Sequence, residues 1–129
     1  MILYSKIRPY LMKVARPDFQ GLCSADIYPL SVKTGQLDRN YLFYLLLSPA
    51  FTEYANAGSA RAGMPKVNRD HLFAFRTFLP SVTKQKQFAM NLDTLHEKTQ
   101  QLESIYQQKL DELEALKKSL LDQAFTGEL

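Results

Sequence analysis

The stretch from Thr83 to about Ala124 constrains the fold of this chain more than any other. Apolar and aromatic side chains recur along it at alternating steps of four and three residues, and no glycine or proline interrupts them. Ten positions follow this period, and eight are apolar or aromatic: Phe88, Leu92, Leu95, Leu102, Tyr106, Leu113, Leu116 and Leu120. A period of 3.5 residues kept over this length predicts one coiled-coil helix, about 60 Å long.

We call these ten positions the seam, and its two polar members are Thr99 and Lys109. A helix cannot bury a seam on itself, and the sequence predicts no second helix of comparable length. The pattern therefore predicts a homodimer formed through this helix. Ile105 and Leu110 flank the seam beside Lys109, which leaves open a local change of register. The glutamines of this stretch, Gln85 among them, are expected on solvated faces.

Charge is unevenly distributed between the two parts of the chain. Residues 1–80 carry ten Lys/Arg against five Asp/Glu, whereas residues 81–129 carry six against eight. We expect residues 1–80 to form a small domain and residues 81–129 to form the long helix, which makes the chain α+β. The basic balance of residues 1–80 favours a polyanion as the partner of that domain.

Cys23 is the single cysteine of the 129 residues, which excludes a disulfide framework and argues against a cysteine-based zinc site. We expect it to be a small buried side chain in a protein of the reducing cytoplasm. No apolar run approaches the ~20 residues of a membrane span. The sequence also lacks metal-ligand spacing and any nucleophile beside a base, so we expect no metal, no cofactor and no enzymatic activity.

Residues 2–32 are predicted to form strands. Runs rich in β-forming residues occur at 2–4, 11–15 and 27–32, and Pro9, Pro17 and Gly21 mark the bends between them. Lys6, Arg8, Lys13 and Arg16 form a basic cluster in this region. Tyr4 and Tyr10 are interleaved with it, which suits phosphate contact and base stacking, although solvated strand faces explain the same pattern.

Two short helices are predicted next, and they are expected to supply the core. Asp38 or Asn40 can cap a helix over 41–47, and Ser48 followed by Pro49 begins a second one that ends at Gly58. After a glycine-containing loop, Asn68 can cap a single helical turn. Residues 73–79 alternate like a strand, and Ser81 or Thr83 is expected to begin the long helix.

The loop from Gly58 to Asn68 holds two glycines, a proline and two cations, so it can approach an anion closely. It lacks the Gly-Lys-Ser/Thr ending of a phosphate-binding P-loop. Together with the early strands it supplies the candidate residues for contact with a polyanion: Lys6, Arg8, Lys13, Arg61, Lys66 and Arg69.

Seven short motifs then stand in one order along nearly the whole chain. They are Ile2-Leu-Tyr-Ser-Lys-Ile-Arg-Pro-Tyr-Leu; Cys23-Ser24; Tyr41-Leu-Phe-Tyr-Leu-Leu-Leu-Ser-Pro with Phe51; Gly58-Ser59 with Met64-Pro-Lys-Val-Asn; Leu79-Pro80; Gln85-Lys86; and Phe125-Thr-Gly-Glu-Leu. In this order the motifs resemble the specificity subunit of Type I restriction-modification enzymes.

The resemblance implies a non-catalytic subunit that recognises double-stranded DNA. Members of that family carry two target-recognition domains, each reading half of a split site, separated by two long antiparallel helices that dock the methyltransferase subunits. Through these the restriction subunit is an indirect partner. Residues 1–80 correspond to the later part of one recognition domain, and residues 81–129 correspond to one spacer helix.

Two other hypotheses remain open from the residues alone. The chain fits a dimeric coiled-coil adaptor whose first domain binds protein, and this hypothesis differs from DNA recognition in the salt dependence of DNA binding. A small enzyme would need a convergent acid–base pair, which the sequence does not offer.

Overall fold

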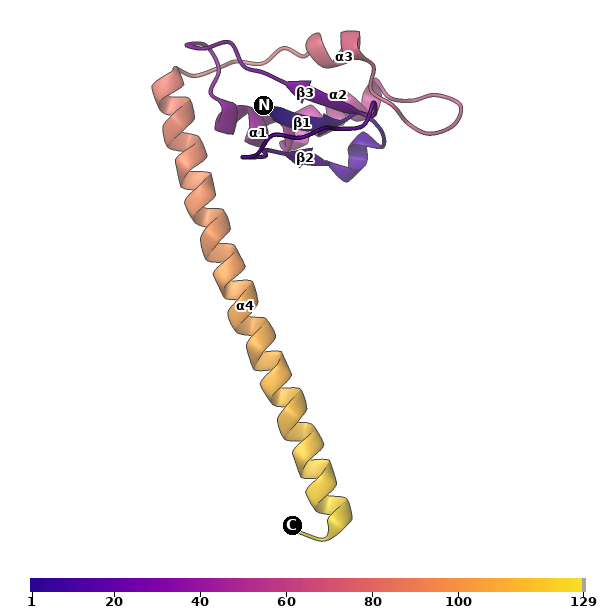
Figure 1. Cartoon of the computed structure of the whole chain (residues 1–129), viewed down its shortest axis with the longest axis vertical. Coiled ribbons are helices and arrows are strands. Elements are labelled where there is room, and N and C mark those ends of the chain that lie inside the picture. The colour runs from indigo at the N-terminus through magenta and orange to yellow at the C-terminus, as the bar shows by residue number, and fades with distance from the viewer. Residues whose placement is uncertain (129) are drawn as a thin grey trace. The chain divides into compact units, whose positions relative to one another are not determined.

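The computed structural model describes residues 1–128, so Leu129, the last residue of the tail motif, lies outside the described residues. The chain divides into two compact units, Met1–Met90 and Asn91–Leu129, which we call the head and the rod. The head combines a small sheet with short helices, and the rod is helical as far as Thr126 (Figure 1). This confirms the predicted α+β class.

Three antiparallel strands form the sheet of the head, with the first strand in the middle. Strand β1 (Ile2–Ser5) pairs with β2 (Val14–Ala15) on one side and with β3 (Ile27–Leu30) on the other (Figure 1). The three predicted strands therefore exist, but two are shorter than expected. Leu11 belongs to a 3-10 helix, η1 (Pro9–Leu11), and β3 ends at Leu30.

Helices α1 (Arg39–Leu46) and α2 (Pro49–Ala57) begin at the capping residues that the sequence indicates. The side chain of Asp38 accepts hydrogen bonds from the backbone N–H groups of Asn40 and Tyr41. Ser48 accepts one from the N–H of Phe51, and proline occupies the first position of α2. Each cap satisfies N–H groups that would otherwise lack a partner, so these signals fix the helix starts.

The core of the head lies between the sheet and these two helices, as predicted. Its buried members are Ile2, Tyr4, Leu42, Leu46, Phe51, Ala55, Val67 and Leu72. Ile2 and Tyr4 alternate with Leu3, so one face of β1 is buried. Phe51 packs edge-on against Tyr4, with ring centroids 5.6 Å apart, and against Phe75, at 5.1 Å.

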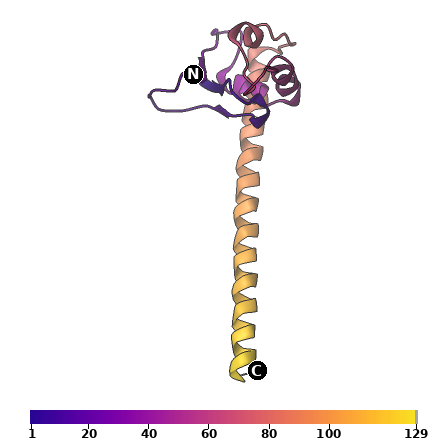
Figure 2. The same ribbon diagram turned by 90° about the vertical axis from the view of Figure 1, so that its right-hand side faces the viewer.

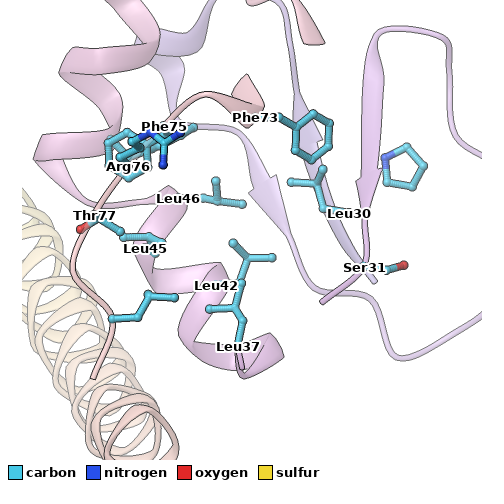
Figure 3. Close-up of a pocket in the computed structure, with 13 residues that line it drawn as sticks. Leu30, Ser31, Leu37, Leu42, Leu45, Leu46, Phe73, Phe75, Arg76 and Thr77 are labelled. Atoms are coloured by element: carbon cyan, nitrogen blue, oxygen red, sulfur yellow. The ribbon is translucent and has the colours of Figure 1, made fainter. Parts of the chain in front are cut away.

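Helix α3 (Arg69–Phe73) is the single turn expected after Asn68, whose side chain accepts from the N–H of His71. The strand predicted over residues 73–79 is wrong: residues 74–81 are irregular. Figure 3 shows Phe73, Phe75 and Thr77 beside an open groove of about 470 Å³, whose floor includes Leu42 and Leu46. The segment lies along this groove and has no strand partner, so its alternation reflects which side chains face the groove.

Helix α4 (Val82–Thr126) begins where Ser81 accepts from the N–H of Lys84, and it continues without interruption (Figure 2). Its first turns belong to the head, which therefore reaches beyond residue 80. The expectation that Gln85 is solvated is wrong. Gln85 is 0% exposed, and its amide donates to the carbonyl oxygens of Gln36 (3.1 Å) and Pro80 (2.8 Å) and accepts from the N–H of Asp38 (2.8 Å).

In the rod, the seam lies on the surface of a single helix. Leu95, Leu102, Tyr106, Leu113, Leu116 and Leu120 are all exposed, and Leu113 keeps 62% of its surface accessible. Within residues 1–128 the longest other helix has nine residues, so nothing described in the chain can pair with the rod along its length. None of the described helices is long and apolar enough to cross a membrane.

Cys23 is exposed, which corrects the prediction of a buried side chain. It lies in the connection between β2 and β3, where the neighbouring Leu22 is fully exposed as well. An irregular connection runs over the surface because water must satisfy its backbone groups, so the apolar character of these side chains does not place them inside.

Gly58 ends helix α2 against the ring of His71. That ring stacks on Tyr54 with centroids 4.0 Å apart, and its Nε2 lies 2.8 Å from the carbonyl oxygen of Tyr54. The hydroxyl of Tyr54 in turn donates to the carbonyl oxygen of His71, at 2.6 Å. A Cβ on residue 58 would overlap the imidazole, which is held in place from two sides.

We expect Gly58→Ala to lower the free energy of unfolding by roughly 1–3 kcal/mol, because the ring has to move out of its contacts. Gly21→Ala is the matched control, since a Cβ there meets ordinary van der Waals distances, and its effect is expected within about 0.5 kcal/mol. Urea denaturation followed by circular dichroism measures both. Equal stability of the two variants would contradict the packing of His71.

Candidate nucleic-acid interface

The connection between β1 and β2 carries three of the six predicted DNA-binding residues. Lys6 follows β1 directly, Arg8 precedes the 3-10 helix η1, and Lys13 precedes β2. The N–H of Ser5 donates to the carbonyl oxygen of Lys13 at 3.1 Å, so the two ends of the connection lie side by side. Arg8 and Lys13 are exposed, and the ammonium of Lys6 lies 5.1 Å from the ring centroid of Tyr28.

A second segment, distant in sequence, pairs with the start of this connection. The N–H of Arg8 donates to the carbonyl oxygen of Pro65 (2.9 Å), and the N–H of Val67 donates to that of Lys6 (2.7 Å). Ile7 and Lys66 are antiparallel bridge partners between these two bonds. The structure therefore brings the backbone of Lys66 beside Lys6 and Arg8, and we call Lys6, Arg8, Lys13 and Lys66 the basic tip.

The backbone of the basic tip is unusual at two positions. Arg8 and Met12 have φ angles of 48° and 49°, on either side of η1, although neither is glycine. Left-handed backbone in such residues costs free energy and persists only where the surroundings fix it. Here the hydrogen bond from Arg8 to Pro65 and the burial of Pro9 supply that restraint. The sequence carries no signal for this geometry.

The remaining two predicted residues lie on either side of the paired segment. Arg61 is in the exposed loop before Pro65, where Gly63 has a φ of 103°, and its Nε donates to the carbonyl oxygen of Met64. Arg69 begins helix α3, is exposed, and stacks its guanidinium 5.8 Å from the ring centroid of Phe73. Within residues 1–128, the side-chain hydrogen bond of Arg61 and the ring contact of Arg69 go to residues outside the basic tip, so these two cations lie near it in the sequence without joining it.

Of the three other residues of the early basic region, Tyr4 and Arg16 have roles different from those first considered. Tyr4 is 2% exposed, so it cannot stack on a base, and burial raises the pKa of its hydroxyl to about 12. Arg16 is structural: its guanidinium lies 4.5 Å from the ring centroid of Phe43, and its Nη1 donates to the side chain of Asn40. Tyr10 remains 53% exposed at the basic tip and keeps the stacking role open.

Leu11 and Met12 lie between Arg8 and Lys13 and are exposed, as Tyr10 is. The charge pattern alone did not single them out. One acid lies close by, because the N–H of Lys6 donates to the carbonyl oxygen of Asp26. Asp26 and Lys13 share a shallow groove over β1 and β2. The surface thus offers cations and a few apolar side chains on a restrained backbone, which suits phosphate contact with adjacent base contact. Among residues 1–128, no cluster of three metal-ligating side chains occurs.

The chain was compared with known proteins. No protein-family model matches it. It is 35% identical over 128 residues to the specificity subunit of the Type I restriction enzyme EcoDI of Escherichia coli. The aligned region covers 99% of this chain and 28% of the relative, so the chain spans less than a third of that subunit's length.

The alignment covers 99% of this chain, so it includes both the head and the rod. It therefore confirms the resemblance inferred from the seven motifs: this chain is similar, along nearly its whole length, to one section of a Type I restriction enzyme specificity subunit.

Proposed function

We propose that this chain is a non-catalytic DNA-recognition component of a Type I restriction-modification system. One observation carries the proposal. The pairing of residues 6–8 with residues 65–67 assembles the basic tip from two segments, on a chain similar to a specificity subunit. A peripheral surface of lysines and arginines on a restrained backbone suits neutralisation of DNA phosphates, and neighbouring side chains contact base edges.

In this proposal a methyltransferase partner, and not this chain, carries out the chemical reaction. DNA methylation requires the target base to leave the helical stack and enter the pocket of a methyltransferase. The head holds the duplex in register, and the rod docks the methyltransferase subunits and sets the distance to a second recognition domain. The restriction subunit joins through that assembly, and the site of action is the cytoplasm.

The rod also supports self-association. Its exposed leucines need a partner helix, and a second copy of the same seam supplies one. We infer a homodimer formed through Phe88, Leu92, Leu95, Leu102, Tyr106, Leu113, Leu116 and Leu120. In such a dimer each head serves one half of a split DNA site.

The proposal is tested by measuring the DNA affinity of a variant that lacks the six predicted cations. We expect the sextuple alanine variant of Lys6, Arg8, Lys13, Arg61, Lys66 and Arg69 to bind a labelled mixed-sequence duplex roughly a thousandfold more weakly at ~0.1 M salt, because each lost phosphate contact removes counterion release. Fluorescence anisotropy measures the affinity.

The matched control removes six charges elsewhere. Lys33, Arg76, Lys84, Lys86, Lys117 and Lys118 are exposed and lie outside both the basic tip and the seam. Their alanine variant has the same net charge as the first and is expected to keep most of the affinity. Equal weakening in the two variants would mean that net charge, and not this surface, drives binding.

A further inference from the structure

The connection between β1 and β2 holds three consecutive apolar side chains at the surface. Tyr10, Leu11 and Met12 keep 53%, 45% and 45% of their surface accessible. The N–H of Leu11 donates to the carbonyl oxygen of Arg8, and the N–H of Met12 donates to that of Pro9, each at 3.0 Å. These two hydrogen bonds close successive turns around the three residues, which we call the apex of the connection.

The backbone beneath the apex is fixed from several sides. Pro9 is buried, and η1 lies against helix α2. Arg8 is tied to Pro65 by its backbone hydrogen bond. The left-handed conformation of Arg8 and Met12 costs free energy, and such costs gather at functional sites. A backbone held in this way keeps the apex side chains at the surface instead of letting them fold back onto the core.

Cations surround the apex. From Lys6 to Lys13 the chain has three cations and no acid, and the paired segment adds Lys66. Phe19 and Leu22 are also exposed apolar residues of the head, but their nearest charged neighbours along the chain are acids. The apex is therefore matched to a partner that is a polyanion with apolar surfaces close to its charges, and duplex DNA has both.

We propose that Leu11 and Met12 form a wedge that inserts between two stacked base pairs of the duplex bound at the basic tip. The inference rests on the proposed function and deepens it, because it names the side chains that deform the DNA. Leucine and methionine are among the residues that DNA-bending proteins insert between base steps, where they partially unstack the bases and kink the duplex. The neighbouring cations hold the flanking phosphates.

Insertion needs the rigidity that this connection has. Separating two stacked base pairs costs free energy, so a wedge on a yielding loop would move aside instead of opening the step. Once a step is open, the adjacent base leaves the stack more easily, which is the movement that a methyltransferase requires of its target. Tyr10, at the same apex, offers a ring on which an unstacked base can stack.

Two duplexes that differ in one base pair separate insertion from phosphate contact. A mixed-sequence duplex and the same duplex with one central mismatch carry equal numbers of phosphates, so the electrostatic contribution to binding is the same. A mismatch is already partly unstacked, which removes part of the cost of insertion. We expect the parent chain to bind the mismatched duplex about tenfold more tightly, as measured by fluorescence anisotropy. The adenine analogue 2-aminopurine, placed beside the mismatch, is expected to brighten on binding because it leaves the stack.

Two variants remove the wedge in different ways. Leu11→Ser with Met12→Asn is expected to abolish both the preference for the mismatch and the brightening, and asparagine is used because it tolerates left-handed backbone. Leu11→Lys with Met12→Lys adds two cations, so it is expected to bind the matched duplex at least as tightly as the parent and still lose the preference. Circular dichroism in urea checks that each variant is folded, and if one is not, the other carries the test.

Phe19→Ser with Leu22→Ser is the matched control, because it removes two exposed apolar side chains from another connection of the head. It is expected to keep the preference. A parent without a preference, a wedge variant that keeps it, or a control that loses it would each show that Leu11 and Met12 do not insert. These results leave DNA recognition by the cations standing. A parent that binds neither duplex at ~50 mM salt would overturn that recognition, and the wedge with it.

Discussion

Gln85→Ala is expected to lower the free energy of unfolding of the head by roughly 3–5 kcal/mol, because three part-buried backbone groups lose their partner at once. The amide of Gln85 is the hydrogen-bond partner of the N–H of Asp38 and of the carbonyl oxygens of Gln36 and Pro80. Asp38 also caps helix α1, so the loss extends to the start of that helix. Urea denaturation followed by tyrosine fluorescence measures the change.

Gln87→Ala is the matched control for this prediction. Gln87 lies two residues further along the same helix and is exposed, so its replacement is expected to change the stability by less than about 0.5 kcal/mol. If Gln85→Ala were as stable as this control, the anchoring of α4 on the head would be wrong.

The second large effect concerns the seam. Leu113→Lys is expected to weaken the homodimer roughly a thousandfold, since each dimer loses two buried leucines and gains two charges in its core. Leu102→Lys is expected to act in the same way. Sedimentation velocity at tens of micromolar measures the distribution of monomer and dimer.

Gln100→Lys is the control for the seam, because it introduces the same charge on a face of the same helix away from the seam. Its dimer is expected to match the parent. A parent chain that sediments as a monomer in this range would remove the homodimer proposal, and equal dissociation of all three variants would mean that the seam does not form the interface.

Local signals explain why much of the fold could be predicted from the sequence. Asp38, Ser48 and Asn68 cap the helices they precede, and each needs only N–H groups two or three residues ahead. The long helix was predictable for a similar reason, because its period of 3.5 is visible without any knowledge of a partner. The similarity to a specificity subunit could be recognised for the same reason, because it rests on short motifs that follow one another in a fixed order.

Contacts between distant residues explain what could not be predicted. Gln85 is buried because residues 36, 38 and 80 surround its amide, and a glutamine on a helix otherwise suggests solvent. Residues 73–79 alternate like a strand, yet they lie along a groove lined by leucines (Figure 3).

The candidate site, too, was predictable only in part. Its six cations could be proposed from their residue type and their place near turns. Their role in DNA binding remains a prediction until binding is measured. The pairing of residues 6–8 with 65–67 joins segments almost sixty residues apart, so no local pattern indicates it. The left-handed backbone of Arg8 and Met12 was equally invisible in the sequence.

The most direct test of DNA recognition is the salt dependence of binding. The affinity of the parent chain for a mixed-sequence duplex is measured by anisotropy between ~50 and ~200 mM salt, and the logarithm of the affinity is plotted against that of the salt concentration. A parent that uses all six cations gives a slope near −5, and the sextuple alanine variant gives a slope close to zero where binding is still detectable. A parent that does not bind DNA at ~50 mM salt, or whose slope matches that of the variant, would contradict the proposed recognition of DNA by this surface.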